Sequence, residues 1–405
     1  MSRKPKIRKP NKNSGTKVGS VLKIIIFILI ILTLAVIGMV YMSVFNYKPR
    51  VQIDDELPFE TISEDEIIPE SEDNVKPAKT SSGKYKRSDD DFYTFLLLGK
   101  DHIAMNTDVI MLVSFNITND EIAIMQIPRD TYMELNGKAH KINSVYAALY
   151  SAAKRNGDDD PVMSGMNAFA DLLQKNLNVK IDYRAFMYLD GFRNIIDAIG
   201  GVDIDIPYNM YYNDPDQDLY IDLKAGPTTL DGKQSEQFIR YRSGYIEGDI
   251  GRVNAQKIFM SALLNQVKNN LSITKISKIA SEAIKNVKTQ ISLNDTVYFA
   301  KQGLGADISN AVMFTLPGRD ARADGNSGAW YYIMYRADTL NLINRYFNVY
   351  TEEITDSIFD INKAFTDERR SHINKIYNTS PADINDYLHT VDDIDANGVK
   401  IPLSR

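Results

Sequence analysis

The chain contains an uncharged run of 24 residues, Ile24–Tyr47, which includes the segment IIIFILIILTLAVIGMV. A helix rises about 1.5 Å per residue, so roughly 20 such residues cross the ~30 Å hydrocarbon core of a bilayer. The run is too long for the apolar part of a cleavable signal, and YMSVFNYK offers no clear small-x-small cleavage site. We therefore predict a transmembrane helix over residues 24–47, with a buried core helix as the less favoured alternative.

The residues before this run are strongly basic and contain no acidic side chain. The eight basic residues are Arg3, Lys4, Lys6, Arg8, Lys9, Lys12, Lys17 and Lys23. Positively charged flanks stay on the cytoplasmic side of a membrane. Residues 1–23 are therefore predicted to form a cytoplasmic tail, and everything after Lys48 is predicted to lie outside the cell.

Charge and cysteine content exclude several classes of function. The formal net charge is −6, and subtracting the eight positive charges of the tail leaves −14 for the rest of the chain. A domain this acidic is a poor general binder of nucleic acid, which requires a positive field, so we expect no nucleic-acid partner. The chain has no cysteine, which excludes disulfides, thiolate metal sites and cysteine nucleophiles.

The segment that follows the apolar run changes in character near residue 90. Residues 48–90 include DDELPFETISEDEIIPESED, which is self-repelling and buries little surface, so an extracellular acidic linker is predicted there. Apolar strand patterns then appear in DFYTFLLLG, DVIMLVSFNI and EIAIMQIP, and TND between the last two suits a hairpin turn.

Helical periodicity follows these strand patterns. The three apolar stripes are Val145, Ala148, Leu149 and Ala152; Met166, Phe169, Leu173 and Leu177; and Phe186, Leu189, Phe192, Ile196 and Ile199. Gly200-Gly201 is expected to end the third helix. Strand patterns resume in VDIDIP and YIDLKAGPTTLDG, Asp231 can cap a helix through GKQSEQFI, and GRVNAQKIFMSALLNQV begins a longer helix.

This alternation of strands and helices predicts an α/β domain over residues 91–350, with a mixed central sheet flanked by helices. One transmembrane helix would precede it. Residues 351–405 are polar and weakly patterned, so we expect a C-terminal tail there.

Two short stretches at strand ends carry residues suited to phosphate chemistry. Asp101 and Asp108 bracket a loop after an apolar strand, and carboxylate oxygens are what Mg²⁺ takes; turn capping is the alternative. Arg129 and Asp130 follow Pro128 where another strand ends, and ligand-binding groups gather at such places in α/β sheets. A surface Arg–Asp pair that satisfies itself is the alternative for the second stretch.

A third stretch, FIRYRSGYIEGDIGRVNAQK, gathers three arginines. If Ile239–Arg242 is extended, Arg240 and Arg242 lie on one face, with Ile239 and Tyr241 on the other. Arg252 would then begin the next helix, with Gln256 one turn further on the same side. Helix amino termini attract anions, and the planar fork of arginine binds phosphate through two hydrogen bonds. The alternative is a set of solvated surface arginines.

Other chemistries lack a pattern in this sequence. The four histidines have no metal-ligand spacing, and no G-x-S-x-G, P-loop or G-x-G-x-x-G motif is present. A nucleophilic serine or a nucleotide cofactor is therefore not predicted.

Taken together, these stretches resemble the LytR-CpsA-Psr family of cell-envelope proteins. The match runs in order from Phe92 to Phe347 through FLLLGKD, TDVIMLVS, IPRDTY, KINSVYA, YLDGFRNIIDAIGGVDIDIP, LKAGPTTLDGKQSEQFIRYR, GDIGRVNAQ and a late LPG. PRDTY, IGGVDIDIP and the R-x-R…GD-x-GR string are specific as a set. The predicted membrane anchor and exterior domain fit the same family.

The resemblance implies a membrane-anchored phosphotransferase in a Gram-positive-type envelope. It would move a glycopolymer, with its phosphate, from a polyprenyl-pyrophosphate carrier to a peptidoglycan sugar hydroxyl, and so attach teichoic acid or capsule. An apolar pocket would take the lipid.

The resemblance also implies roles for particular residues. The metal ligands for Mg²⁺ or Mn²⁺ would be Asp101 and Asp108, the pyrophosphate would be bound by Arg129, Arg240, Arg242, Arg252 and Gln256, and the catalytic set would be Arg129, Asp130, Arg240 and Arg242. Asp130 or Asp101 would accept the proton of the sugar hydroxyl.

Two positions depart from the family pattern. Asn106 stands where the family usually has an arginine, two residues before the second aspartate, and Ala255 stands where many members have an arginine before the glutamine. A non-catalytic binder of the lipid-linked glycan and a lipid pyrophosphatase remain alternatives. A transcriptional regulator would need a cytoplasmic domain with a basic DNA-reading surface, and the sequence predicts neither.

Overall fold

The computed structural model describes most of the chain from Lys86 onward. The described residues are 47–49, 86–100, 106–136, 138–215, 219–241, 249–270, 279, 285–322, 329–356, 359 and 384–390. Those from Lys86 on belong to one compact unit, whereas residues 47–49 belong to another. Among the described residues, no helix has the length and apolar character needed to span a bilayer.

Several predictions fall on residues outside these ranges. The basic tail, the predicted transmembrane helix apart from Tyr47, and most of the acidic linker lie outside the described residues. Asp101 and Arg242 also lie outside them.

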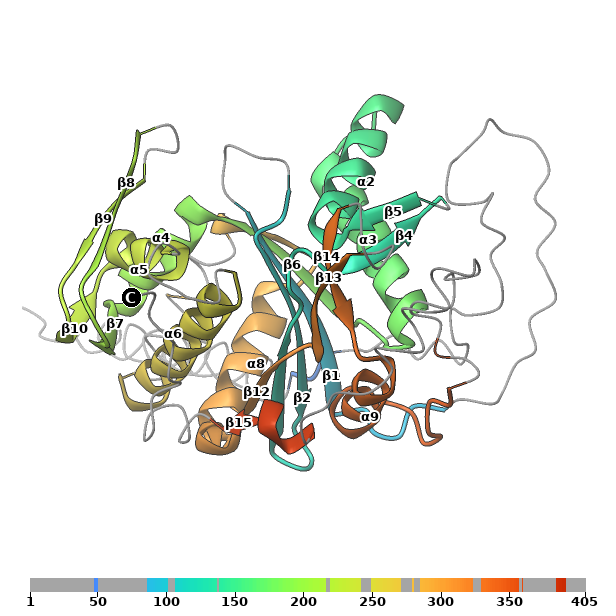
Figure 1. Ribbon diagram of the computed structural model, residues 1–405. Coiled ribbons are helices and arrows are strands. Elements are labelled where there is room, and N and C mark those ends of the chain that lie inside the picture. The colour runs from blue at the N-terminus through green and yellow to red at the C-terminus, as the bar shows by residue number, and fades with distance from the viewer. Residues whose placement is uncertain are drawn as a thin grey trace, which may run out of the picture. The chain divides into compact units, whose positions relative to one another are not determined.

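A seven-stranded mixed sheet forms the centre of the larger unit (Figure 1). In spatial order its strands are β11 (Val287–Thr289), β6 (Tyr183–Tyr188), β1 (Phe92–Lys100), β2 (Val109–Asn116), β3 (Glu121–Gln126), β12 (Val312–Thr315) and β15 (His389–Thr390). The β1–β2 and β2–β3 pairs are antiparallel, whereas β1–β6 and β3–β12 are parallel. The predicted α/β class with a mixed central sheet is thereby confirmed.

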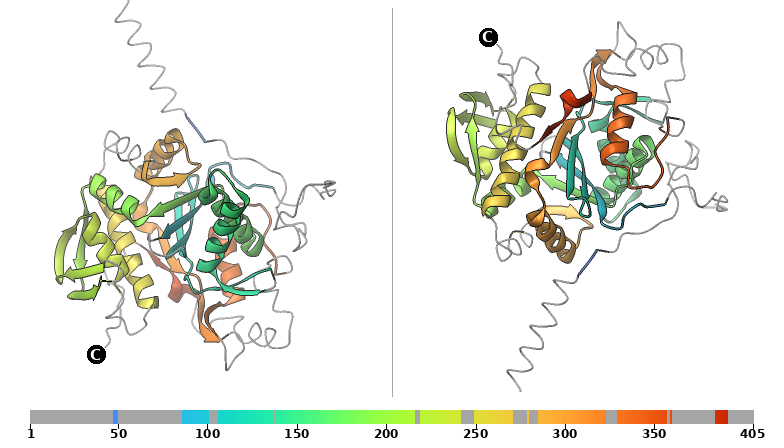
Figure 2. Two further views of the ribbon diagram at one scale, coloured as in Figure 1. Left: turned by 90° about the horizontal axis from the view of Figure 1, so that it is seen from above. Right: turned by 90° about the horizontal axis from the view of Figure 1, so that it is seen from below.

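Helices cover both faces of this sheet (Figures 1 and 2). On one face lie α2 (Ile142–Asn156), α3 (Pro161–Leu177) and α9 (Arg336–Tyr346), and on the other lie α4 (Leu189–Ile199), α5 (Gly232–Arg240), α6 (Asp249–Asn270) and α8 (Leu293–Gly305). Two short 3₁₀ helices are also described, η3 (Ile308–Asn310) and η4 (Ile384–Tyr387).

Strands β1 and β2 are apolar at successive positions because helices cover both faces of the sheet. Side chains alternate between the faces of a strand, so a strand between two helical layers needs apolar residues at successive positions. Leu96 and Leu98 belong to the core that contains Phe169 of α3, while Leu97 packs in a smaller cluster with Met260 of α6. Each helical layer therefore has a core of its own.

The second predicted apolar stripe is confirmed as the buried face of α3. The first is right in part, because Val145 is buried and Ala148 and Leu149 are half-buried against the core, while the buried apolar residues of α2 also include Ile142, Tyr146 and Ala153. The third prediction is right for α4 but wrong for Phe186, which lies in β6 opposite Leu98 of β1. Strand pairing determines the conformation of Phe186, and its spacing to the next apolar residues is coincidental. Gly200, in the left-handed region at φ 99°, ends α4 as predicted.

Four short two-stranded sheets are described in addition to the central one. Their strands are β7 (Val202–Ile206) with β10 (Gly226–Leu230), β8 (Met210–Asp214) with β9 (Leu219–Leu223), β4 (Tyr132–Leu135) with β5 (Lys138–Lys141), and β13 (Gly318–Arg322) with β14 (Trp330–Met334). The first two sheets share a buried core with α4, α5 and α6, in which Phe238 and Phe259 take part. This core fixes the helices that line the site described below.

Some residues after position 350 pack on the domain. Ile354 and Phe359 are buried in the largest core, Arg336 donates to the carbonyl oxygen of Phe359 at 2.6 Å, and β15 pairs with the edge strand β12. These described residues are therefore part of the folded unit.

The start of α5 confirms the predicted cap at Asp231, and the end of α5 corrects the backbone conformation considered for Ile239 and Arg240. Asp231 accepts from the backbone N–H of Gln234 at 2.8 Å, and the Gln234 side chain accepts in turn from the Asp231 N–H, which forms a capping box. The extended conformation considered for Ile239–Arg242 does not hold at Ile239 and Arg240, because α5 continues through Arg240. Phe238 is fully buried inside this helix, and burying it favours the helical conformation.

Gly232 allows a close approach between α4 and α5. A Cβ atom at this position would lie 2.3 Å from the carbonyl oxygen of Arg193. We expect Gly232→Ala to lower the free energy of unfolding by about 1–3 kcal/mol, because the two helix backbones must separate. Chemical denaturation of both proteins measures the change.

Lys233→Ala is the matched control, since Lys233 is exposed in the same helical turn. We expect it to change stability by less than about 0.5 kcal/mol. Equal stability of the Gly232→Ala variant and the wild type would contradict the close packing of α4 on α5.

Candidate functional site

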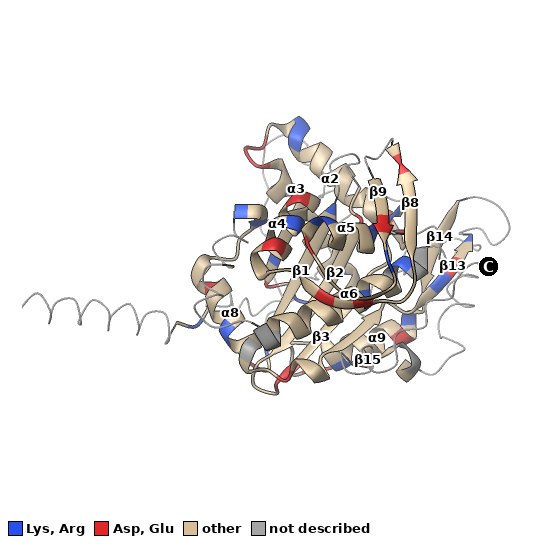
Figure 3. Cartoon of the chain, turned by 90° about the vertical axis from the view of Figure 1, so that its left-hand side faces the viewer, with Lys and Arg blue, Asp and Glu red and all other residues tan. Residues whose placement is uncertain are grey.

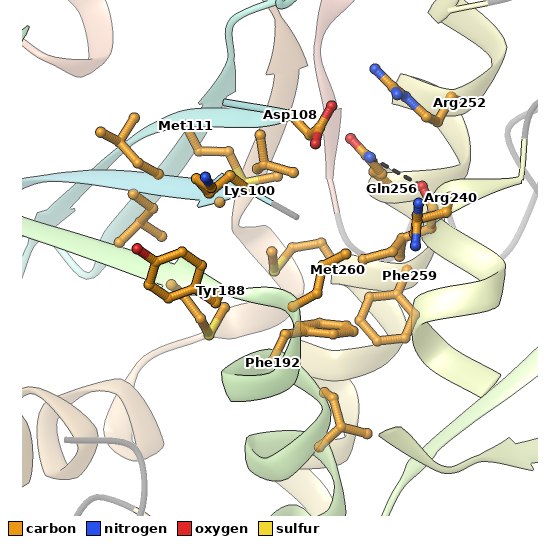
Figure 4. Close-up of a pocket in the computed structure, with 18 of the residues that line it drawn as sticks. Lys100, Asp108, Met111, Tyr188, Phe192, Arg240, Arg252, Gln256, Phe259 and Met260 are labelled. Carbon is orange, nitrogen blue, oxygen red and sulfur yellow. Dashed lines mark hydrogen bonds between the residues drawn. The ribbon is translucent and has the colours of Figure 1, made fainter. Parts of the chain in front are cut away.

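A pocket with a volume of about 510 Å³ lies between the central sheet and the helices α4 and α6. Strands β1, β2 and β6 supply one wall, and the β8–β9 hairpin adds Tyr212 and Leu219. Its lining is mainly apolar, with Met111, Phe192 and Phe259 among the larger side chains (Figure 4). A pocket of this size and character suits an apolar ligand or the apolar part of one.

Polar and charged side chains gather along one side of this pocket (Figure 4). The charged and amide residues of the lining are Lys100, Asp108, Arg240, Arg252 and Gln256. Three of the four charged residues are cationic, so the polar side carries a positive excess. The pocket therefore joins an apolar body to an anion-attracting side, as an amphipathic anionic ligand requires.

Arg240 is held by a buried carboxylate one turn earlier in α5. Its Nη1 donates to Glu236 Oε1 at 2.8 Å, and Arg193 of α4 donates through Nε to the other oxygen of Glu236. Glu236 is only 4% exposed, so its charge must be matched by these cations. Arg193 Nη1 also lies 3.3 Å from Asp190 Oδ1, so the two guanidinium groups meet two carboxylates, and Arg240 is the cation of this group that lines the pocket.

Arg252 and Gln256 stand one turn apart on α6, and both are buried. The Gln256 side chain donates to the carbonyl oxygen of Ile239 at 3.2 Å and accepts from the side-chain amide of Gln126 in β3. Gln256 thus connects α6 to the end of α5 and to the central sheet. This connection fixes Arg252 and Arg240 relative to each other.

Asp108 lies at the start of β2 and meets the turn that follows β3. Its Oδ1 is 3.4 Å from Arg129 Nη1, and Arg129 Nε lies 3.9 Å from Asp130 Oδ1. The other oxygen of Asp130 accepts from Lys141 Nζ at 2.9 Å. Asp130 is therefore placed between two cations beside the pocket.

The structure brings most of the predicted site residues together. Asp108, Arg240, Arg252 and Gln256 line one pocket, and Arg129 adjoins it through Asp108. Asp130 does not line the pocket and is directed to Lys141.

Lys100 and Tyr188 line the pocket and were not among the predicted site residues. Lys100 ends β1 beside Tyr188 of β6, and its ammonium lies 5.5 Å from the centre of the Tyr188 ring. Burial raises the pKa of Tyr188, so its phenol stays protonated and can donate a hydrogen bond. In the sequence, Lys100 directly follows the apolar run LLLG. A charged residue at the end of a buried strand requires a partner, and this position was therefore the signal for a further site residue.

The oxygen atoms at Asp108 and Thr107 are of the kind that bind a hard cation such as Mg²⁺. Within the described ranges no three His, Cys, Asp or Glu side chains form a metal cluster. The hydroxyl of Thr107, next to Asp108, is buried and has no hydrogen-bond partner among the described residues. Mg²⁺ commonly takes only one or two carboxylates and completes its shell with water and phosphate oxygens, so this donor set fits.

A model of the LytR_cpsA_psr family matches residues 61–347 of the chain. This chain belongs to the LytR_cpsA_psr family. The resemblance inferred from the ordered motifs is thereby confirmed. The matched range includes each described pocket residue and the Arg129 turn.

Two proteins similar to this chain have names that state a reaction. A Bacillus subtilis protein named polyisoprenyl-teichoic acid–peptidoglycan teichoic acid transferase TagV is 27% identical over 58% of this chain and 57% of its own. A Bacillus cereus protein with the corresponding name TagU is 29% identical over 67% of this chain and 84% of its own. The chain thus spans little more than half the length of the TagV relative.

The fold agrees with a solved member of the LytR_cpsA_psr family. The crystal structure of Bacillus subtilis TagV superposes with a TM-score of 0.51 at 21% identity, covering 72% of this chain and 98% of that one. This likeness supports the mixed α/β architecture described above.

The buried Lys257, next to Gln256 on α6, makes the stability of the fold depend on pH. Burial lowers the pKa of its ammonium from 10.5 to about 8, so folding disfavours the charged form. The penalty is full below pH 8 and disappears as the pH rises toward 10.5. We expect Lys257→Met to stabilise the protein at pH 7 by on the order of a few kcal/mol, with a gain that shrinks in alkaline solution.

Urea denaturation of both proteins across this pH range measures the effect. Lys233→Met is the control, because that exposed lysine should give no comparable gain. A stabilisation by Lys257→Met that stays constant with pH would contradict a titrating buried ammonium.

Proposed function

We propose that this chain is a membrane-anchored transferase of the cell envelope. It moves a glycopolymer, with its phosphate, from a polyprenyl-pyrophosphate carrier to a sugar hydroxyl of peptidoglycan. The observation that carries the proposal is the pocket in which apolar walls adjoin Arg240, Arg252 and Lys100. The names of the TagV and TagU relatives, which specify a polyisoprenyl-linked teichoic acid and peptidoglycan, support it.

The apolar body of the pocket suits the prenyl chain of the carrier. Each methylene group that leaves water contributes about 0.8 kcal/mol, so a long chain binds far more tightly than a free sugar diphosphate. Phe192 and Phe259 lie with their rings 5.6 Å apart at this end and offer flat surfaces to an unsaturated chain.

The cationic side of the pocket suits the pyrophosphate. Arg240 and Arg252 approach from α5 and α6, and Lys100 lies on the sheet wall opposite (Figure 4). Guanidinium groups can bind phosphate oxygens through two hydrogen bonds and keep their charge at any physiological pH. With Gln256 fixing the two helices, the cations are arranged before the ligand binds, which is the condition for efficient charge stabilisation.

Asp108, together with Asp101 by the family resemblance, would hold Mg²⁺ or Mn²⁺. Such an ion supplies charge neutralisation for the phosphate oxygens when bound. The contact with Arg129 keeps the Asp108 carboxylate oriented at the start of β2.

The transfer itself needs mainly positioning and charge stabilisation from the protein. The acceptor hydroxyl attacks the phosphorus that carries the glycan, the bond to the second phosphate breaks, and polyprenyl phosphate departs. Arg240 and Arg252 stabilise the charge on the departing phosphate. The hydroxyl proton passes to a carboxylate, and Asp130, beside Arg129, is the described candidate for that role.

The location at the membrane follows from the sequence alone. The predicted helix over residues 24–47 would hold the domain at the outer surface of the cell membrane, where the lipid carrier presents its pyrophosphate. The basic residues 1–23 would keep the amino terminus in the cytoplasm.

The proposal predicts that Arg240→Ala lowers kcat/KM for transfer about 100-fold or more, as removal of one charge-stabilising donor does in other enzymes. The assay uses the full-length protein in detergent with a polyprenyl-pyrophosphate-linked glycan, Mg²⁺ and peptidoglycan fragments. It follows both glycan transfer and released polyprenyl phosphate. Arg240→Lys keeps the charge without the planar fork and should retain part of the activity.

Arg155→Ala is the matched control, because Arg155 is an exposed arginine at the end of α2, away from the pocket lining. Thermal unfolding of each variant separates loss of activity from loss of folding. Release of polyprenyl phosphate without glycan transfer would identify a lipid pyrophosphatase instead. Carrier binding without either product would identify a binding protein.

A further inference from the structure

The single tryptophan of the chain is exposed on a short hairpin. Trp330 begins β14 with 56% of its surface accessible, and the guanidinium of Arg322, directly opposite in β13, lies 5.1 Å from the indole ring centre. Figure 3 marks basic residues on β13. An exposed apolar residue is ordinary by itself, so the position of this hairpin decides its meaning.

The hairpin is bonded to the turn that carries Arg129 and Asp130. The backbone N–H of Tyr332 donates to the carbonyl oxygen of Asp130 at 2.8 Å, and Tyr332 forms a parallel bridge with Thr131. Trp330 lies two residues before Tyr332 in β14, so the hairpin that carries the indole is joined to the turn whose Asp130 is proposed to accept the hydroxyl proton.

The hairpin is also held firmly. The ring of Tyr331 meets Tyr132 of β4 edge-on, with 5.2 Å between centres, and Ile333 and Ala321 are buried on that face. On the opposite face the Tyr332 hydroxyl donates to the carbonyl oxygen of Leu316 at 2.7 Å. A rigid support means that binding at Trp330 requires little ordering of the protein.

A flat indole with a guanidinium beside it suits the face of a sugar ring. The ring C–H groups pack on the aromatic surface, and the guanidinium can hydrogen-bond hydroxyl, amide or carboxylate oxygens of the same chain. Asp320, exposed on the same face of the hairpin, adds an acceptor for sugar hydroxyl groups and balances the charge of Arg322, so this face has no positive excess to attract an anionic lipid surface. These features favour a carbohydrate over a membrane as the occupant.

We propose that Trp330 and Arg322 form a binding platform for the peptidoglycan acceptor, with one sugar ring stacked on the indole. This inference rests on the proposed transferase function. The platform holds the glycan strand beside the Arg129–Asp130 turn, so that a hydroxyl of a neighbouring sugar can reach the phosphate at the pocket. The platform binds the acceptor, whereas the pocket binds the lipid-linked donor.

Tryptophan fluorescence tests the platform directly, because all tryptophan emission of this chain comes from Trp330. We would titrate the full-length protein in detergent with soluble, uncrosslinked peptidoglycan fragments. A saturable change in emission is expected. An emission change with anionic lipid vesicles but none with the glycan would overturn the proposal in favour of a membrane contact.

Kinetics of the Trp330→Ala variant supply the second measurement. We expect the acceptor KM to rise about tenfold, in line with the loss of one aromatic stacking contact, while kcat and the donor KM stay unchanged. Trp330→Tyr should keep most of the acceptor affinity. Tyr211→Ala is the control, because Tyr211 is a 70% exposed aromatic residue on the separate β8–β9 hairpin.

The two measurements separate this inference from the transferase proposal. If the wild type transfers glycan and Trp330→Ala keeps the wild-type acceptor KM, the platform is wrong and the transferase stands. If glycan saturably changes the emission but no variant or wild type transfers it, the platform stands and the transferase is wrong.

Discussion

The requirement that strand β1 bury both of its faces organises this fold. Leu96 and Leu98 pack into a dense core with α2 and α3, whereas Leu97 and Gly99 face the side covered by α4 and α6. The second side holds the pocket that Arg240 and Arg252 line, whereas a smaller cavity of about 220 Å³ lies beside α9 on the first side. Because β1 ends at Lys100, the same strand that builds the apolar wall also delivers a cation to the polar side. One strand thereby links the core of the fold to the site.

Buried charge determines how the cationic side is built. Glu236 is almost inaccessible, and a buried carboxylate is destabilising unless cations and hydrogen bonds match it. Arg193 and Arg240 meet that need together, which fixes α4 against α5 and aims Arg240 at the pocket. Gln256 then ties α6 to the end of α5. The same contacts that stabilise the three helices arrange the groups proposed to bind pyrophosphate.

Local patterns predicted much of this structure, and long-range pairing explains what they missed. The capping residue Asp231 and the stripe of α3 could be predicted because short-range periodicity and local hydrogen bonds determine them. Phe186 was assigned to a helix because its spacing is helical, yet pairing with β1 makes it a strand residue. Arg240 was expected in an extended segment, but burial of its neighbour Phe238 continues α5. Motif order predicted the family, although the contact between Lys100 and Tyr188 depends on strand register that no local pattern encodes.

The most direct test of the account is the position of a bound polyprenyl pyrophosphate in a crystal structure of this protein. The account predicts phosphate oxygens within about 3 Å of the guanidinium groups of Arg240 and Arg252, the distance of charge-assisted hydrogen bonds. It also predicts the prenyl chain against Met111, Phe192 and Phe259 between the sheet and α6. A lipid bound elsewhere, or a pyrophosphate that contacts neither arginine, would contradict the claim that this pocket is the donor site.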